Sequence, residues 1–291
     1  MLNNFRLIMT ILVKNEIDII ESNIRTHAKL GVDGFVIMDN NSTDGTRELL
    51  SQLQKEFNII IVDEKETYKQ SKFMLKLAKI AKERLKANWV INNDADEFWL
   101  PKNSKNLKEN LNFNGSVLTV HRYNMILEEK KPFFQSEYFV KNPIFYSKEN
   151  QLKGEGSIIL TKIAPKTIVN PKGLLYLRGG NHKALHIKNI RDYFKSGYDK
   201  IRRFKNIEIF HFPIRSYKQF EKNIKNRKEL LENKKKVSMG PHYRRWVKIY
   251  NEGKLEEEFY KNIIFKQRDI QTLVKYNILQ RDKTIQKSLI I

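Results

Sequence analysis

Three acidic residues, Asp94, Asp96 and Glu97, closely follow the short apolar run 89–91. The run has the composition of a buried strand, and alternation along an extended chain turns Asp94 and Asp96 to the same side where that strand ends. Two carboxylates this close repel each other unless a cation lies between them, and such hard oxygen ligands suit Mg²⁺ or Mn²⁺. The pattern fits a metal site or a solvated acidic turn, because a lone D-x-D is a weak signal. The apolar residues 98–100 on the far side favour the metal site.

Regular elements must hold these acids, and the first hundred residues alternate between two periodicities. Nearly continuous apolar runs at 6–13, 34–38, 59–62 and 89–91 predict strands, whereas helical spacing at 18–30, 46–56 and 73–85 predicts helices. Strands that alternate with helices in this way predict an α/β fold, with a mostly parallel central sheet and helices on both faces.

Polar clusters lie at the carboxyl ends of three of these strands. Asn15 and Glu16 follow the first strand, residues 39–44 follow the second, and the acids at 94–97 follow the fourth. Ligands of parallel sheets bind beyond the carboxyl ends of the strands. We therefore expect the three clusters to meet at one edge and to form one site.

The pattern changes after residue 100. Apolar stretches at 116–120, 157–163 and 207–213 predict strands, and the chain from residue 216 onward has helical spacing with many charges. Gly240-Pro241 predicts a break, after which two or three more helices are expected in 242–291.

Composition places the chain among ordinary globular proteins. Hydrophobic residues make up 40% of its 291 residues, and there is no cysteine, which excludes disulfides and thiolate metal sites and fits a reducing cytoplasm. The apolar stretch near the start is interrupted by Thr10 and is too short to cross a membrane.

The positive charge lies almost entirely in the later part of the chain. Residues 1–100 carry a net charge of −1 and residues 101–291 a net charge of +23. A basic surface of this strength attracts anions such as acidic lipids, nucleic acid or a phosphorylated acceptor, although an AT-rich coding sequence gives the same excess of lysine. Base readout favours arginine, and arginine is the minority, so nucleic acid is not an expected partner.

The residues of the three clusters also resemble the motifs of a known family. Val13-Lys-Asn-Glu16, the run Asp-Asn-Asn-Ser-Thr-Asp-Gly-Thr at 39–46, and Asp94-Ala-Asp-Glu-Phe98 resemble those of the family 2 glycosyltransferases, in the branch of small bacterial enzymes. The resemblance covers about residues 6–100, and His211-Phe-Pro-Ile-Arg-Ser216 is a further shared element. It implies the GT-A fold, a nucleotide-sugar donor, a divalent metal and inversion at the sugar carbon.

The resemblance also implies roles for individual residues. Asp39 should accept a hydrogen bond from a ring N–H of the donor's base, and Asp96 should hold Mn²⁺ or Mg²⁺ with help from Asp94. The nucleotide pocket is expected to be lined by Val13, Asn15, Glu16 and Asn41, with Lys72 reaching the phosphates. Asn41 stands where the family has glycine, which leaves the base open, and a UDP-sugar is the expected donor.

Transfer to a hydroxyl also needs a general base that takes the acceptor's proton. We predict that Glu155, in the glycine-flanked loop 153–157, is this base, and Asp192 and Glu97 stay open as alternatives. A simple loop acid at residue 155 fits the same sequence.

Three histidines offer further polar groups. His182, His186 and His211 are candidates for a metal ligand, a phosphate donor or an acceptor contact, although a lone histidine is commonly structural. His211 ends a predicted strand and is followed by Arg215, a pair that suggests phosphate recognition.

We predict a GT-A catalytic domain at 1–215, with a nucleotide-sugar-binding half at 1–100 and an acceptor half at 101–215, and a basic helical extension at 216–291. The predicted function is metal-dependent, inverting transfer of a sugar to a cell-surface glycan, such as lipopolysaccharide or capsule, or to its lipid-linked precursor. The predicted location is the cytoplasm, with peripheral contact at the inner face of the membrane. The alternatives are sugar-1-phosphate nucleotidyl transfer, for which a glycine-rich phosphate loop is missing after the first strand, and a non-enzymatic basic module that binds nucleic acid or membranes.

Overall fold

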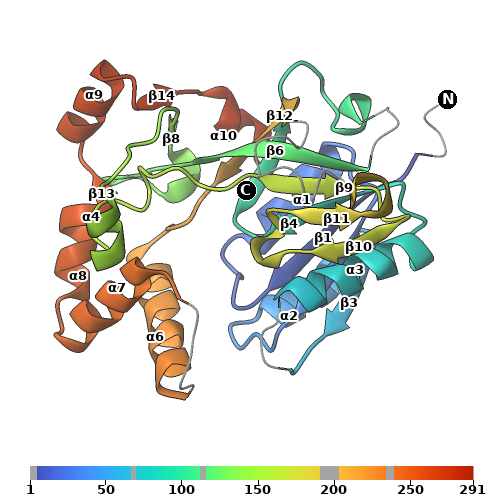
Figure 1. Cartoon of the computed structure of the whole chain (residues 1–291), viewed down its shortest axis with the longest axis horizontal. Helices are drawn as coiled ribbons and strands as arrows, with labels where there is room; N and C mark the ends of the chain where they lie inside the picture. Colours follow the sequence, from blue (N-terminus) through green and yellow to red (C-terminus); the bar gives the residue numbers. More distant parts are fainter. Residues whose placement is uncertain (1–4, 67–69, 112–115, 191–202, 234–238, 291) are drawn as a thin grey trace. The chain divides into compact units, whose positions relative to one another are not determined.

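The computed structural model describes residues 5–66, 70–111, 116–190, 203–233 and 239–290 (Figure 1). Contacts divide the chain into two compact units, the first comprising Met1–Arg122, Ala164–Phe210 and Ser288–Ile291, and the second Tyr123–Ile163 and His211–Lys287. This division does not follow the boundary that we predict at residue 215, because each unit takes segments from both sides of it. The division into a catalytic domain and an extension stays a prediction.

The first unit is built on an eight-stranded sheet with the strand order β3-β2-β1-β4-β9-β6-β12-β5. Its first four strands are parallel and consist of β1 (Leu7–Val13), β2 (Gly34–Asp39), β3 (Ile59–Asp63) and β4 (Trp89–Asp94). They are connected by α1 (Ile20–Lys29), α2 (Thr46–Leu53) and α3 (Gln70–Arg84). These elements match the predicted ones closely, and the α/β fold is confirmed.

Strands β1 and β2 form the centre of the parallel half because almost all their side chains are apolar on both faces. Every residue of β2 is buried, and so is every residue of β1 except Leu12, as expected for strands that are covered by helices on each side. The core on the α3 side contains Val36, Met38, Phe73, Met74, Leu77 and Val90.

The other half of the sheet was not predicted as such. It consists of β9 (Lys166–Val169), β6 (Val117–Asn124), β12 (Arg203–His211) and the edge strand β5 (Glu97–Pro101). β9 pairs antiparallel with both β4 and β6. The remaining elements of this unit are η1 (Lys108–Asn110), the hairpin of β10 (Leu174–Leu177) and β11 (Ala184–His186), η3 (Gly179–Asn181) and η4 (Ile187–Asn189).

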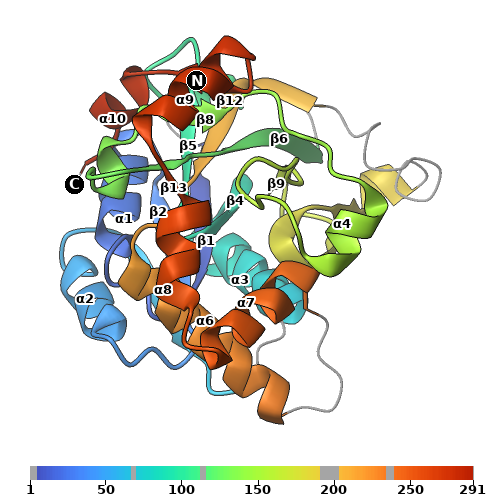
Figure 2. The ribbon, with the colours of Figure 1, turned by 90° about the vertical axis from the view of Figure 1, so that its left-hand side faces the viewer.

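The second unit is mostly helical. Its elements are β7 (Leu127–Glu128), η2 (Phe133–Gln135), β8 (Tyr138–Val140), α4 (Lys148–Lys153), α6 (Tyr217–Asn233), α7 (Pro241–Asn251), α8 (Leu255–Glu258), the π-helix η6 (Phe259–Ile263), β13 (Ile264–Phe265), α9 (Gln267–Lys275), β14 (Leu279–Arg281) and α10 (Thr284–Ser288). Helices α6, α7 and α8 lie beside one another (Figure 2), where Phe220 packs edge-on against Trp246. As predicted, the break falls at Gly240-Pro241, and Pro241 is the first residue of α7. No helix in the described part of the chain is long and apolar enough to cross a membrane.

The prediction of a strand at 157–163 is wrong. These residues form turns, with a single bridge between Thr161 and Ile144. Side chains take the hydrogen bonds that a neighbouring strand would need, because Asn124 Nδ2 donates to the carbonyl oxygen of Ile159 at 2.8 Å and the hydroxyl oxygen of Tyr146 accepts from Ser157 N–H at 3.1 Å. The helices expected in 242–291 are present, but β13 and β14 were missed because each pairs with a strand more than a hundred residues away.

Candidate active site

The strand register brings two of the three polar clusters to either side of β1. Val13 lies opposite Asp39 of β2, and Leu12 lies opposite Asp94 of β4. The third cluster, Asn15 and Glu16, follows the end of β1 itself. The expectation that all three clusters lie at one edge of the sheet is therefore confirmed.

The loops after β1 and β2 are joined by direct hydrogen bonds. The backbone N–H of Asn15 donates to Ser42 Oγ at 2.9 Å, and Thr43 N–H donates to Asn15 Oδ1 at 2.7 Å. Glu16 N–H donates to Thr46 Oγ1 at 2.9 Å. Asn15 and Asn41 both have φ of 61°, a left-handed conformation that asparagine tolerates better than most residues, and this explains how Asn41 replaces a glycine.

Asp39 ends β2 with a carboxylate that is only half satisfied. The side chain is buried, with 4% of the residue exposed, and Oδ2 accepts a hydrogen bond from Ser42 N–H at 3.0 Å. Oδ1 is also buried and has no hydrogen-bond donor among the described residues. Because a buried acceptor without a donor is costly, this oxygen is suited to receive an N–H from a ligand.

Asp94 is engaged by a buried lysine. Lys166, the first residue of β9, is 1% exposed at its side chain and forms an ion pair with Asp94 Oδ2. The other carboxylate oxygen accepts a hydrogen bond from Asn181 Nδ2 at 3.4 Å. Both oxygens of Asp94 thus have protein partners.

Glu97 is held by two cations in the interior. Its side chain is 0% exposed, its Oε1 forms an ion pair with Arg122 of β6, and Lys166 Nζ lies 3.3 Å from the same oxygen. Oε2 is buried without a hydrogen bond in the described part of the chain. This burial argues against Glu97 as the general base, because a base must reach the acceptor's hydroxyl.

A buried polar network under the acidic turn fixes its backbone. Asn23 of α1 donates through Nδ2 to the carbonyl oxygens of Ala95 and Glu97 at 2.8 and 2.9 Å. His27, one turn later, lies between the carbonyl oxygen of Asn23, 2.8 Å from Nδ1, and the N–H of Trp99, which donates to Nε2 at 3.0 Å. Burial lowers the pKa of His27 to about 4, so the ring is neutral at pH 7 and can accept from Trp99.

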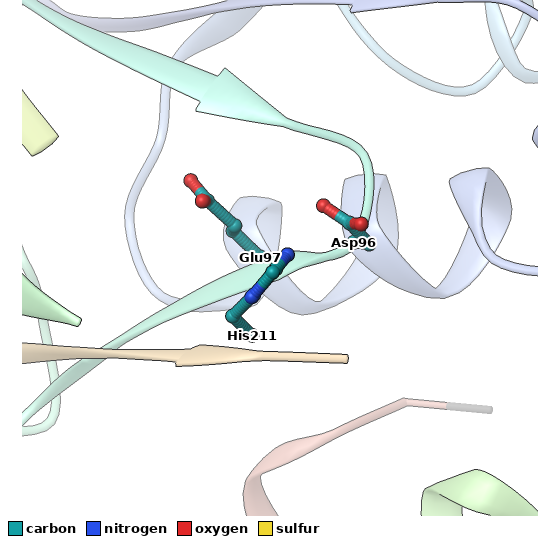
Figure 3. A group of neighbouring side chains, drawn as sticks. All are labelled: Asp96, Glu97 and His211. Atoms are coloured by element: carbon teal, nitrogen blue, oxygen red, sulfur yellow. The ribbon is translucent and has the colours of Figure 1, made fainter. Parts of the chain in front are cut away.

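Asp96, Glu97 and His211 present a potential set of metal ligands (Figure 3). Asp96 lies in the turn between β4 and β5, Glu97 begins β5, and His211 ends β12, which neighbours β5 in the sheet. One ligand atom from each of the three can be chosen so that all lie within 4.8 Å of one another. Carboxylate oxygens suit Mg²⁺ and Mn²⁺, and an imidazole in the set favours Mn²⁺, so these residues fit a divalent ion.

Two other histidines have structural partners in the first unit. The pKa of His182 is lowered to about 4, mainly by burial and then by the nearby charge of Lys166, and its Nδ1 lies 2.8 Å from the carbonyl oxygen of Pro165. His186 bridges the carbonyl oxygen of Lys172 and the N–H of Lys188, and burial lowers its pKa. Neither histidine belongs to the group of potential metal ligands found among the described residues.

The remaining predicted residues are Lys72, Glu155, Arg215 and Asp192. Lys72 is exposed on α3, with Nζ 3.4 Å from Glu66 Oε2. Glu155 and the buried Arg215 both belong to the second unit, where Glu155 lines two cavities of about 430 and 270 Å³. Asp192 lies outside the described residues.

Sequence reasoning missed Lys166, Arg122, Asn23 and His27. A single lysine or arginine in a strand gives no signal in a chain with 55 basic residues. Asn23 and His27 did leave a signal, because they lie four residues apart on the apolar face of a helix, where a polar side chain needs a buried partner.

Comparison with known proteins identifies a family and several similar structures. The model of the family Glycosyl transferase family 2 matches residues 10–164. Among solved structures, S. aureus TarS 1–349 in complex with UDP is similar, with 13% identity, a TM-score of 0.43, and coverage of 89% of this chain and 73% of that one. The same protein in complex with UDP-GlcNAc has 12% identity, a TM-score of 0.45, and coverage of 88% and 73%. A mycobacterial protein has 14% identity, a TM-score of 0.38, and coverage of 78% and 74%. No curated protein matches the sequence.

Proposed function

Because the chain belongs to glycosyl transferase family 2 and is a glycosyltransferase, we propose that it moves a sugar from a nucleotide-sugar donor to a glycan with inversion at the sugar carbon. The observation that carries the proposal is the edge of the sheet where Asp39, with a buried unsatisfied oxygen, and Asp94 flank the end of β1. The proposed acceptor is a hydroxyl of a cell-surface glycan, such as capsule or lipopolysaccharide, or of its lipid-linked precursor.

The donor's nucleoside is proposed to bind at the linked loops after β1 and β2. Asp39 Oδ1 accepts a ring N–H of the base, which supplies the hydrogen bond that this oxygen lacks. Val13, Asn15, Glu16 and Asn41 line the pocket, and their backbones are fixed by the hydrogen bonds between the two loops. We propose Lys72, His211 and Arg215 as phosphate-binding residues, the last two because they belong to the shared element at 211–216.

A divalent ion, Mn²⁺ or Mg²⁺, is proposed to be held by Asp96, with Asp94 helping directly or through the donor and a water. Glu97 and His211 each offer a ligand atom near Asp96 that would complete the set. Such an ion supplies positive charge at the diphosphate as it leaves. The protein's own part is to hold the acidic turn rigid, which Asn23 does through two backbone carbonyl groups.

The acceptor's proton is proposed to pass to Glu155. Its loop is shaped by two glycines with positive φ, Gly154 and Gly156, and its carboxylate lines a cavity of about 430 Å³ in the second unit. The same cavity is lined by Phe145, which is 79% exposed, and by Tyr146. An exposed aromatic ring in the same cavity as an acidic residue suits a sugar ring, which has apolar faces and hydroxyl edges.

Thermal unfolding with Mn²⁺ and nucleoside diphosphates tests the donor site. We expect Mn²⁺ and UDP together to raise Tm by more than the sum of their separate effects, because each ligand contributes to the binding of the other. Asp96→Asn should remove this synergy and reduce transfer at least 100-fold, whereas Asp63→Asn, at the end of the outer strand β3, should keep both. A screen of nucleotide sugars by mass spectrometry then identifies the donor.

The same titration separates the alternatives. A non-enzymatic basic module should show no synergy between metal and nucleotide. A nucleotidyltransferase should instead form a nucleotide sugar from a nucleoside triphosphate and a sugar-1-phosphate. Retention of full transfer by Asp96→Asn would contradict the assignment of the metal to this residue.

A further inference from the structure

The second unit contains a further cavity, of about 270 Å³, that the proposed function does not use. Glu155 lines this cavity and also the cavity of about 430 Å³ that is proposed to receive the acceptor. Gly156 and Ile158 belong to both linings as well, so the two cavities adjoin at this loop. Helix α7 runs along both, because His242 lines the larger cavity and Arg245, one turn later, lines the smaller one.

Close packing fixes the loop that separates the two cavities. Gly154 and Gly156 have φ of 71° and 89°, a conformation that favours glycine. A Cβ atom on Gly154 would lie 2.7 Å from the backbone of Pro241 at the start of α7, and one on Gly156 would lie 2.6 Å from the ring of Tyr146. The helix α4, which precedes the loop, also lies beside α7 (Figure 2). Glu155 is therefore held at the boundary between the cavities.

The polar part of the smaller cavity is a hydrogen-bond network around Glu258. This residue is 8% exposed, and its carboxylate accepts hydrogen bonds from Arg245 Nη1 at 2.7 Å and Nη2 at 3.1 Å. Trp246 Nε1 donates to it at 3.2 Å and Asn262 Nδ2 at 2.7 Å. Burial acts to raise the pKa of Glu258, but the hydrogen bonds from Arg245 and Asn262 outweigh burial and lower this pKa. Glu258 is therefore ionised at neutral pH, and Arg245 balances its charge.

Asn262 joins this network from the π-helix η6. Such a turn is rare in proteins and is frequently found at functional sites. Asn262 is exposed, and within the described residues no donor reaches its amide oxygen. Arg245 also has N–H groups that Glu258 does not use. The network thus presents both an acceptor and donors to the cavity.

The lining of the smaller cavity suits one uncharged sugar ring. Trp246 and Ile263 provide apolar surface, while the groups of Asn262 and Arg245 match sugar hydroxyls, which both donate and accept. Because Arg245 and Glu258 balance each other, Glu155 gives the lining a net negative charge that disfavours a phosphate or a uronic acid. Whole ligands occupy pockets of about 300–1,000 Å³, so this cavity has the size of a subsite.

We propose that the smaller cavity binds a second, uncharged sugar residue of the acceptor. The proposal rests on the proposed function, because it takes the larger cavity as the site of the first acceptor sugar. Two adjoining cavities that share Glu155 fit two neighbouring residues of one glycan. The acceptor is therefore an oligosaccharide, and Arg245, Trp246 and Asn262 bind a sugar residue that does not react.

Titrations followed by saturation-transfer NMR test this subsite on the full chain, with UDP and Mn²⁺ present. The probes are the methyl glycosides of glucose, galactose, mannose and N-acetylglucosamine, disaccharides of the same sugars, and disaccharides in which glucuronic acid replaces one sugar. We expect the best neutral disaccharide to bind about tenfold more tightly than either of its constituent glycosides, because the second ring adds buried surface and hydrogen bonds. Glucuronic acid in place of the second sugar should remove this gain, because its carboxylate is repelled.

Asn262→Trp should lower the affinity for this disaccharide to that of its monosaccharide, because the larger side chain fills the smaller cavity. The control is Asn251→Trp, the same substitution at an exposed residue that ends α7 and lines neither cavity, and it should keep the gain. If Asn262→Trp does not fold by circular dichroism, Asn262→Ala removes the amide without filling the cavity. This variant should bind the disaccharide about threefold more weakly than the wild type, through the loss of one hydrogen bond.

A folded Asn262→Trp protein that keeps the gain overturns the proposal, and so does a wild type that binds disaccharides no more tightly than monosaccharides. Consumption of nucleotide sugars, measured on the same samples, separates this result from a failure of the proposed function. A protein that consumes a nucleotide sugar but binds none of the saccharides contradicts only the roles of the two cavities. A protein that consumes no nucleotide sugar contradicts the proposed function itself.

Discussion

At the scale of single residues, the buried carboxylate of Asp39 destabilises the free protein and is expected to stabilise its complex with the nucleotide. Its buried Oδ1 lacks a donor in the described part of the chain, and an unsatisfied buried acceptor costs about 1–3 kcal/mol. An unsatisfied buried oxygen does not stabilise the free protein. It is explained if the oxygen accepts a hydrogen bond from an N–H group of a ligand.

Asp39→Asn should therefore separate stability from binding. The amide oxygen still accepts from Ser42 N–H and the buried charge is gone, so we expect the free energy of unfolding without ligand to stay equal or to rise by about 1 kcal/mol. The affinity for UDP should fall at least tenfold, about 1.4 kcal/mol. Chemical denaturation and calorimetric titration measure the two quantities, and a loss of stability with unchanged UDP affinity would assign Asp39 a structural role only.

At the scale of elements, α1 holds the acidic turn and β5 through two of its buried side chains. His27 receives the N–H of Trp99 only while its Nε2 is unprotonated. Because the pKa of His27 is about 4 when folded and 6.5 when unfolded, its contribution to stability is fully present above pH 6.5 and is lost as the pH falls toward 4.

We expect the wild type to become less stable between pH 7 and pH 4.5, with His27 accounting for about 2 kcal/mol of the loss. His27→Gln should be less stable at pH 7 but should lose correspondingly less on acidification. Urea unfolding at the two pH values measures this. His242, in the second unit, has a pKa lowered to about 4 by burial, so His242→Gln is a matched control that leaves the α1–β5 connection intact. An identical pH dependence in wild type and His27→Gln would contradict the assignment.

The parallel elements were predictable from the sequence, and so were the approximate positions of β6 and β12, whereas the pairing in this other half of the sheet was not. β1 is an uninterrupted apolar run that only a doubly covered strand accounts for. β5 is five residues long and its place in the sheet depends on β12, which follows a hundred residues later. The acidic residues of the site were predicted because they directly follow a predicted strand. Lys166 was missed because it reaches Asp94 only through the pairing of β9 with β4 and β6, which are distant in the sequence.

At the scale of the whole molecule, the net charge of +22 predicts attraction to anionic surfaces. The helices α6 and α7 lie beside each other and carry exposed lysines, including Lys218 and Lys248. We propose that they form a face that contacts acidic lipids, which would bring a lipid-linked acceptor to the enzyme.

Vesicle flotation tests this face. We expect binding to vesicles with 30% anionic lipid, loss of binding in 0.5 M salt, and no binding to neutral vesicles, with roughly these lipid and salt levels chosen from the range of electrostatic screening. Lys218→Glu/Lys248→Glu should bind at least about fivefold less, whereas the charge-matched pair Lys79→Glu/Lys82→Glu on α3 should bind nearly as the wild type. Equal losses in both variants would show that total charge, and no particular face, governs binding.

The ion pair between Asp94 and Lys166 also affects how the chain can fold during translation. The two residues are 72 positions apart, and the intervening chain includes the whole of 123–163, which belongs to the other unit. During translation the carboxylates of Asp94 and Glu97 leave the ribosome well before their counter-ion, so the nascent sheet cannot close around them until residue 166 has emerged. A stalled chain that ends before this point should remain open to proteases, and a longer one should gain protection in a single step.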